Sequence, residues 1–185
     1  SGVQIWGAQL EAQSFSTSYI PTSGAASTRL QDIATNSGNS TLINSTEGVL
    51  YAEIAALSND GTTRLISLSD GTDTNRIHLF YYSASNGIAV NYRVNGSTVV
   101  SFTSTLTDVN DFLKIAFKWQ SGNFNCYVNG LSIGTNSNTT MLPLNTLNKL
   151  NFSLFNGTQP FYGKTKALAV WKEALSDEEL IALTS

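Results

Sequence analysis

The sequence is poor in cysteine and in charged residues, and each of these shortages argues against certain kinds of site or partner. Cys126 is the only cysteine, so neither an internal disulfide nor a zinc site built on cysteines can form. Charged residues make up 12% of the chain, and its ten Lys and Arg are scattered beside a net charge of −3. This balance argues against nucleic acid as a partner and gives no electrostatic attraction to an anionic membrane. Because no apolar run reaches about 18 residues, membrane insertion is not expected either.

The chain is rich instead in apolar residues and in turn signals. Its 185 residues are 41% hydrophobic, enough for one domain with a sizeable core. Dipeptides that tolerate the positive φ of tight turns begin at Asp60, Asp70, Asn86, Asn95, Asn129 and Asn156. Between them lie runs of strand length that are rich in β-branched and aromatic residues, at 50–54, 64–69, 76–82, 88–94, 98–103, 113–119 and 124–128.

Several of these runs alternate between apolar and polar residues. Ile88, Val90 and Tyr92 share one face of their strand, and this period of two is typical of a sheet with one buried face. By the same spacing we expect Trp119 and Cys126 to point into the core. Short strands separated by regular turns predict a sandwich or a barrel.

One segment near the C-terminal end is typical of a helix. Ser176 can accept a hydrogen bond from the amide of Glu179 while the Glu179 side chain reaches back to the amide of Ser176, which is a capping box. Leu175 and Leu180 have the spacing of a hydrophobic staple across the start of the helix. We therefore expect a short helix at 177–183.

Parts of the chain resemble the laminin-G-like, concanavalin A-like jelly-roll domains. Residues 112–134 are similar to the central hairpin of that family, with an apolar strand, a turn at Gly122, and a second strand that ends in Asn129-Gly130. Residues 163–180 are similar to its last strand and to the helix start that follows. The spacing between the two stretches also fits the family.

The resemblance covers 47–185, with residues 48–54 as an opening strand. It implies an all-β, two-sheet antiparallel jelly-roll sandwich with a short C-terminal helix. The chain departs from the family in one place, because Asp111-Phe112 stands where a Trp-His pair is usual.

The beginning of the chain resembles a segment that recurs in phage and prophage tail or fibre proteins. Gln4 to Glu11 and Ser18 to Thr22 carry this likeness. In those proteins the segment closes one β-sandwich module and leads into a laminin-G-like one, so 1–46 would be a last strand followed by an irregular linker packed on the domain. The chain also begins at Ser1 without a leader and reads as a piece of a longer protein. The likeness implies a virion tail surface, a glycan or host receptor as partner, and a homotrimeric parent fibre.

Two alternatives stay open beside a phage recognition module. The domain could be an ancillary carbohydrate-binding domain of a bacterial secreted polysaccharide-degrading enzyme, or a purely structural fibre domain. Catalysis is not expected, because the paired carboxylates on one strand that hydrolytic relatives carry, spaced as Glu-x-Asp-x-x-Glu, are absent from the sequence. A Gly-x-Ser-x-Gly nucleophile elbow is absent too.

Six polar and aromatic residues are candidates for ligand contact: Arg76, His78, Tyr82, Asn91, Arg93 and Trp171. Arg76, His78 and Tyr82 share one strand face, where the first two would donate hydrogen bonds and the tyrosine would stack on a sugar ring. Asn91 and Arg93 join them if their polar face lines the same sheet. For His78 the alternative is a solvated sheet surface, and for Trp171 it is packing under the terminal helix or under the linker.

Two further expectations concern charge. Because the chain has few charged residues and no basic patch, ligand contacts should be neutral and aromatic, and binding should change little with salt. The oxygen-rich loop with Asp70 and Asp73 is a candidate calcium site, but its sequence favours a simple polar hairpin turn.

Overall fold

A computed structural model describes residues 9–10, 19–27 and 37–185, and it divides the chain into two compact units, Ser1–Asp32 and Ile33–Ser185. In the first unit the described backbone is irregular, and the amide of Ile20 donates a hydrogen bond to Gln9 Oε1 at 2.7 Å. The strand predicted within 1–11 lies outside the described residues apart from two positions, as does part of the linker. All regular structure discussed below belongs to the second unit.

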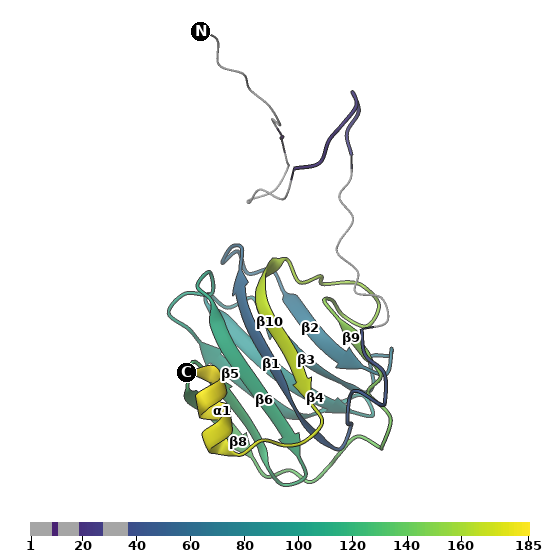
Figure 1. The fold of residues 1–185 in the computed structure, drawn as a ribbon, viewed down its shortest axis with the longest axis vertical. Coiled ribbons are helices and arrows are strands. Elements are labelled where there is room, and N and C mark those ends of the chain that lie inside the picture. The colour runs from purple at the N-terminus through teal and green to yellow at the C-terminus, as the bar shows by residue number, and fades with distance from the viewer. Residues whose placement is uncertain (1–8, 11–18, 28–36) are drawn as a thin grey trace. The chain divides into compact units, whose positions relative to one another are not determined.

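The second unit is a sandwich of two five-stranded antiparallel sheets (Figure 1). Sheet A has the order β10-β1-β6-β7-β8, and sheet B has the order β5-β4-β3-β2-β9. The strands are β1 Glu47–Ala56, β2 Arg64–Ser69, β3 Arg76–Tyr81, β4 Gly87–Val94, β5 Ser97–Thr105, β6 Leu113–Gln120, β7 Phe124–Val128, β8 Leu131–Asn136, β9 Lys149–Asn151 and β10 Gly163–Trp171. The predicted all-β jelly-roll fold is confirmed.

The core fills the space between the two sheets. It is made of the apolar faces that the alternation predicted, such as Ile77, Leu79 and Tyr81 of β3. Trp119 and Cys126 are both completely buried there. The indole Nε1 of Trp119 donates a hydrogen bond to the carbonyl of Asn44 at 3.1 Å, so a buried polar atom is satisfied by the segment that leads into β1.

The hairpin turns follow the dipeptides seen in the sequence. Asn95 and Gly96 take φ values of 49° and 81° between β4 and β5, and Asn129 and Gly130 take 48° and 78° between β7 and β8. Two successive positive φ values define a type I′ turn, whose twist matches that of the paired strands. These turns therefore fix the register of both hairpins, and with it the face on which each side chain lies.

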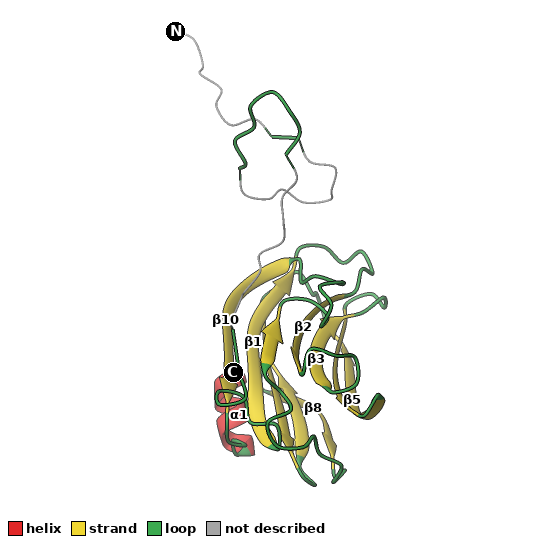
Figure 2. Cartoon of the chain, turned by 90° about the vertical axis from the view of Figure 1, so that its right-hand side faces the viewer, coloured by secondary structure: helices red, strands yellow, loops and turns green. Residues whose placement is uncertain are grey.

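The single helix of the described residues, α1 (Asp177–Thr184), covers the outer face of sheet A (Figure 2). Its capping box is present: Ser176 Oγ accepts from the Glu179 amide at 3.2 Å, and Glu179 Oε2 accepts from the Ser176 amide at 2.8 Å. Leu175 and Leu180 pack in one cluster on that face. In the described residues no helix is long and apolar enough to cross a membrane.

Candidate functional site

The outer face of sheet B has no helix on it and carries side chains in three cross-strand rows. Because every second residue of these strands points into the core, the residues between them point outward together. The apolar row consists of Leu65, Phe80, Ala89 and Thr103; the polar row of Asn151, Ser67, His78, Asn91 and Ser101; and the basic row of Lys149, Ser69, Arg76, Arg93 and Thr98. Neighbouring rows are two residues apart along the strands, which is about 7 Å.

An aromatic ladder runs along β3 across these rows. The His78 imidazole stacks on Phe80 with ring centroids 5.0 Å apart, and Phe80 meets Tyr82 edge-on at 6.3 Å. Tyr82, just beyond the end of β3, lies against Gly87, where a Cβ would come within 2.6 Å of its ring. Glycine at that position therefore lets the tyrosine ring lie flat on the sheet, half-buried, as Phe80 is.

His78 lies at the centre of the polar row and is only 7% exposed. Burial first, and then the positive charges of Arg76 and Arg93, lower its pKa from 6.5 to about 3, so the imidazole is neutral near pH 7. Arg76 Nε donates a hydrogen bond to His78 Nδ1 at 3.3 Å, which places the imidazole proton on Nε2.

The tautomer of His78 also orients Asn91. His78 Nε2 lies 3.4 Å from the terminal amide of Asn91, and an N–H at that position needs an oxygen as its partner. When the Asn91 amide is turned so that Oδ1 faces His78, Oδ1 is the acceptor for the Nε2 proton. This orientation also gives a hydrogen-bond partner to Asn91 Oδ1, a buried atom that otherwise lacks one. The Asn91 NH₂ group then takes the buried position on the side away from His78.

The arginines of the basic row lie opposite each other in the register of β3 and β4. Arg76 contacts Asp73, which comes from the loop between β2 and β3, and Arg93 Nη2 lies 3.8 Å from the other oxygen of that carboxylate. The Arg76 contact is an ion pair without hydrogen-bond alignment. Arg93 Nη2 also donates to the carbonyl of Gly96 in the following turn.

The structure brings five of the six candidate residues to one face. Arg76, His78, Asn91 and Arg93 are neighbours in two rows, and Tyr82 lies at the end of the aromatic ladder. Arg76 and His78 are each 7% exposed, so they support the surface from beneath more than they form it.

Trp171 lies elsewhere, on the outer side of sheet A. It meets Tyr51 edge-on at 6.3 Å and packs in the cluster that includes Leu175 and Leu183. This placement matches the alternative in which Trp171 packs beneath the helical end of the chain, and it separates Trp171 from the site on sheet B.

Phe80, Lys149 and Asn151 are members of this face that were not among the candidate residues. Phe80 lies between His78 and Tyr82 on the predicted strand, so the alternation of β3 was signal enough to include it. Lys149 and Asn151 belong to β9, which is three residues long and pairs only with β2. A strand that short has no recognisable period, and only the folded chain shows that it borders the site.

The proposed calcium loop does not fit a calcium ion as it is arranged. Asp70 Oδ1 accepts hydrogen bonds from the amide and hydroxyl of Thr72, and its Oδ2 accepts from Asn75 at 2.9 Å. Asp73 is paired with the arginines of the basic row. Over the described ranges no three His, Cys, Asp or Glu side chains gather in a way that could hold a metal. The loop instead shapes the edge of the basic row.

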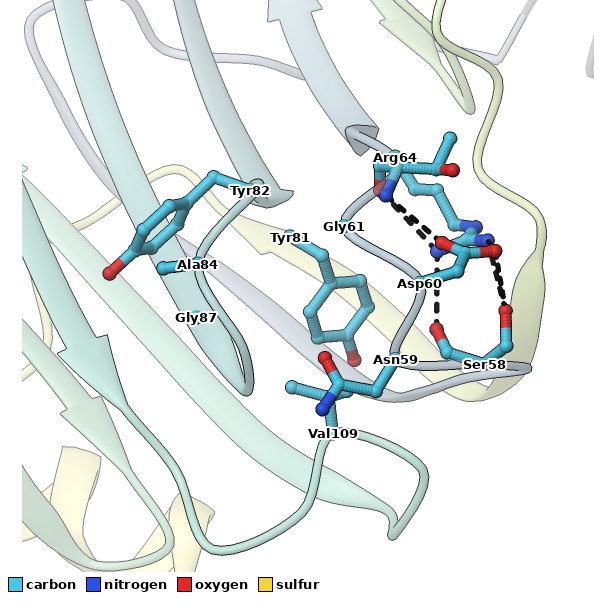
Figure 3. A pocket seen from close by; sticks show the side chains of 11 residues that line it. Ser58, Asn59, Asp60, Gly61, Arg64, Tyr81, Tyr82, Ala84, Gly87 and Val109 are labelled. Carbon is cyan, nitrogen blue, oxygen red and sulfur yellow. Dashed lines mark hydrogen bonds and ion pairs between the residues drawn. The ribbon is translucent and has the colours of Figure 1, made fainter.

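A small pocket lies at one edge of the sandwich, near the end of the aromatic ladder (Figure 3). Tyr82 and the buried Tyr81 line it, and Asp60 lies between Arg64 and Ser58. Arg64 Nη2 and Ser58 Oγ each lie 2.6 Å from Asp60 Oδ2, and the bond from Arg64 is the main reason that the pKa of Asp60 is far below its usual range. These contacts pair the charge of Asp60 with that of Arg64, and they stabilise the loop before β2.

The fold is shared with several solved structures. A carbohydrate-binding module of the Ruminococcus gnavus IT-sialidase (CBM40), solved with α2,3-sialyllactose, superposes with a TM-score of 0.63 at 21% identity over 76% of this chain and 83% of the module. Domain 4 of AbnA, a GH43 extracellular arabinanase of Geobacillus stearothermophilus, solved with arabinotriose, gives 0.62 at 12% identity over 80% and 70%. The botulinum neurotoxin serotype G binding domain gives 0.57 at 16% identity over 77% of this chain and 37% of the other.

Sequence comparison gives the family more directly. No curated protein is similar enough in sequence to match the chain. A model of laminin-G-like domains, described as the concanavalin A-like lectin/glucanases superfamily, matches residues 25–181. That span includes all ten strands and the first turn of α1. The chain therefore belongs to the concanavalin A-like lectin/glucanases superfamily.

Proposed function

We propose that this chain is a non-catalytic glycan-recognition module whose binding surface is the outer face of sheet B. The observation that carries the proposal is the arrangement of that face, where an apolar row with Phe80, next to Tyr82, is followed by a polar row and a basic row about 7 Å apart. Sugar rings need this combination, because their C–H faces pack on aromatic rings while their hydroxyls need hydrogen-bond partners. The ligands in the similar modules of the sialidase and the arabinanase support a glycan as the ligand class.

The proposal of a non-catalytic role depends on the carboxylates. A glycosidase places two carboxyl groups on either side of the scissile bond. Among the described residues of sheet B and its loops, the carboxylates beside the three rows are those of Asp70 and Asp73, and both are held by hydrogen bonds or ion pairs. Neither lies free opposite a second carboxylate, so binding is the chemistry that this face supports best.

Two biological settings are proposed for the module. The segments Gln4 to Glu11 and Ser18 to Thr22 favour a phage tail fibre, which would place the module on the virion tail surface in a homotrimer and make a host glycan or receptor its partner. The structural neighbours that are parts of a sialidase and of an extracellular arabinanase favour the second candidate, an ancillary domain of a secreted bacterial enzyme. The full sequence of the parent protein separates them, since fibre repeats or a catalytic domain would flank the module.

A glycan array followed by titration of the best ligand tests the binding surface. We expect Tyr82→Ala and Asn91→Ala each to weaken binding about fivefold, since an aromatic or hydrogen-bonding contact contributes about 1 kcal/mol. Trp171→Phe is the matched control, because it changes an aromatic residue on the opposite side of the sandwich. Unchanged binding in both sheet B variants, or a loss confined to the Trp171 variant, would reject this face as the site.

A further inference from the structure

The basic row gathers three of the ten Lys and Arg residues of the chain on one face. Arg93, Arg76 and Lys149 project from β4, β3 and β9, with Ser69 of β2 between the last two. Gly71, in the loop after β2, lies so close to Lys149 that a Cβ there would come within 2.5 Å of Nζ. The Lys149 ammonium is therefore folded toward the end of the sheet where the guanidinium groups lie.

This row holds more positive than negative charge. Asp73 is the carboxylate paired with it in the described part of the chain, through Arg76 and, at 3.8 Å, through Arg93. Lys149 forms no ion pair with any residue that the structure describes. Arg93 Nε is buried and lacks a hydrogen-bond partner within the same residues. Even if the nearby Asp70 is counted, three cations face two carboxylates.

The contacts of the arginines within the fold do not account for the excess of positive charge in this row. Like charges directly opposite each other on paired strands destabilise a sheet. Burial, and then the charge of Arg93, lower the pKa of Arg76, so the guanidinium ion of Arg76 is disfavoured by its neighbour. A bound anion would supply the missing negative charge, and guanidinium groups hold carboxylates and sulfates through paired N–H donors.

We propose that the glycan bound by this face carries an anionic group, a carboxylate or a sulfate ester, which contacts Arg93 in the basic row. The inference rests on the proposed function and names its ligand class. A sugar ring over Asn91 in the polar row would place a substituent on the next row, about 7 Å away. Arg76, at 7% exposure, is a positioning residue that holds Asp73 and His78, while the exposed Lys149 adds long-range attraction.

An anionic ligand differs from the neutral ligand that the composition predicted. Because the chain has few cations, its composition predicted neutral ligand contacts and binding that changes little with salt. The register of sheet B instead concentrates cations from the consecutive strands β3 and β4 and from β9, which is distant from them in the sequence. Anion binding at exposed cations weakens as salt screens the charges.

The test uses pairs of ligands that differ only in the acid. Titration compares α2,3-sialyllactose with its methyl ester, sulfated lactose with lactose, and oligogalacturonate with its methyl ester. We expect at least one acidic member to bind about tenfold tighter than its neutral partner. Its affinity should fall severalfold between about 50 and about 300 mM salt. Which acidic member is preferred distinguishes a carboxylate from a sulfate ester.

Variants assign the effect to the row. Arg93→Gln and Lys149→Gln should each lower the ratio of the affinity for the acidic ligand to the affinity for its neutral partner. Lys149 is exposed, so its variant keeps the test valid even if Arg93→Gln unfolds the sheet. Lys172→Gln is the matched control, because Lys172 is an exposed lysine just after β10, in the other sheet.

The outcomes separate this inference from the proposed function. Equal affinity for acidic and neutral partners, with no effect of salt, overturns the anionic ligand and leaves glycan binding intact. Binding of any polyanion, such as an oligonucleotide, as tightly as the acidic glycan also overturns it. Failure to bind any glycan on the array rejects the proposed function itself.

Discussion

Lys118 of β6 and Asp177 of α1 form an ion pair that joins the helix to sheet A, with Nζ and Oδ1 2.7 Å apart. The Lys118 side chain is only 3% exposed, whereas that of Asp177 is 51% exposed. The Asn125 amide lies 3.4 Å from the same carboxylate oxygen. Without the first turn of α1, a lysine in the middle of the sheet would lack this counter-charge.

Asp177→Ala should therefore destabilise the domain. The variant leaves the Lys118 ammonium buried without its partner, and we expect the free energy of unfolding to fall by about 1–2 kcal/mol, between the values for surface pairs and for fully buried pairs. The denaturant midpoint measures the change. Glu178→Ala is the control, because it removes an acidic residue from the same turn of α1 that, among the described residues, makes no hydrogen bond or ion pair to sheet A. Equal losses in both variants would show that the helix dipole, not the pair with Lys118, is responsible.

The N-cap of α1 should contribute measurably to stability. Ser176→Ala leaves the Glu179 amide without its acceptor at 3.2 Å, and we expect a loss of about 1 kcal/mol in the free energy of unfolding. Ser176→Asp keeps an acceptor at the cap, so its midpoint should remain close to that of the unchanged protein. A midpoint for Ser176→Ala that does not move would contradict the role of the capping box.

His78 should make the domain less stable in acid. Its pKa is about 3 in the folded protein against 6.5 for the free side chain, so the unfolded chain binds a proton that the folded chain does not bind at intermediate pH. Stability from the neutral imidazole is present above pH 6.5 and is lost as pH falls toward 3. Between about pH 7 and about pH 5 the expected loss is about 2 kcal/mol.

His78→Gln isolates this contribution, because glutamine does not titrate and can still accept a hydrogen bond from Arg76. The groups that face His78 are the cations Arg76 and Arg93, which keep their charge throughout this range. We expect the variant to lose less stability than the unchanged protein over the same pH interval, by urea unfolding at each pH. Parallel pH profiles for the two proteins would mean that His78 is protonated in the fold.

Cys126 should be inert toward thiol reagents in the native protein. It is completely buried in β7, and burial raises the pKa of its thiol far above the usual range, so the reactive thiolate is scarce. Labelling should be slow in buffer and rapid in denaturant, as followed by intact mass. Labelling in buffer at the denatured rate would contradict the inward orientation of this strand face.

The sequence by itself determined the fold class and much of the local structure. Alternation assigned Trp119 and Cys126 to the core, because a strand presents every second residue to the same face. The capping box located α1 to within one residue of its end, where the Thr184 hydroxyl donates back to the carbonyl of Leu180. These signals are local, so a short stretch of sequence contains all of their physics.

The arrangement of the candidate site was decided only by the tertiary structure. Alternation placed Arg76 and Arg93 on polar strand faces, but only the pairing of β3 with β4 set one opposite the other. Lys149 entered the same row through β9, a strand too short to show a period. Trp171 was separated from them because its strand belongs to the other sheet. Which strands become neighbours depends on packing across the whole core. That pairing, and not any local sequence signal, brings the scattered cations into one basic row.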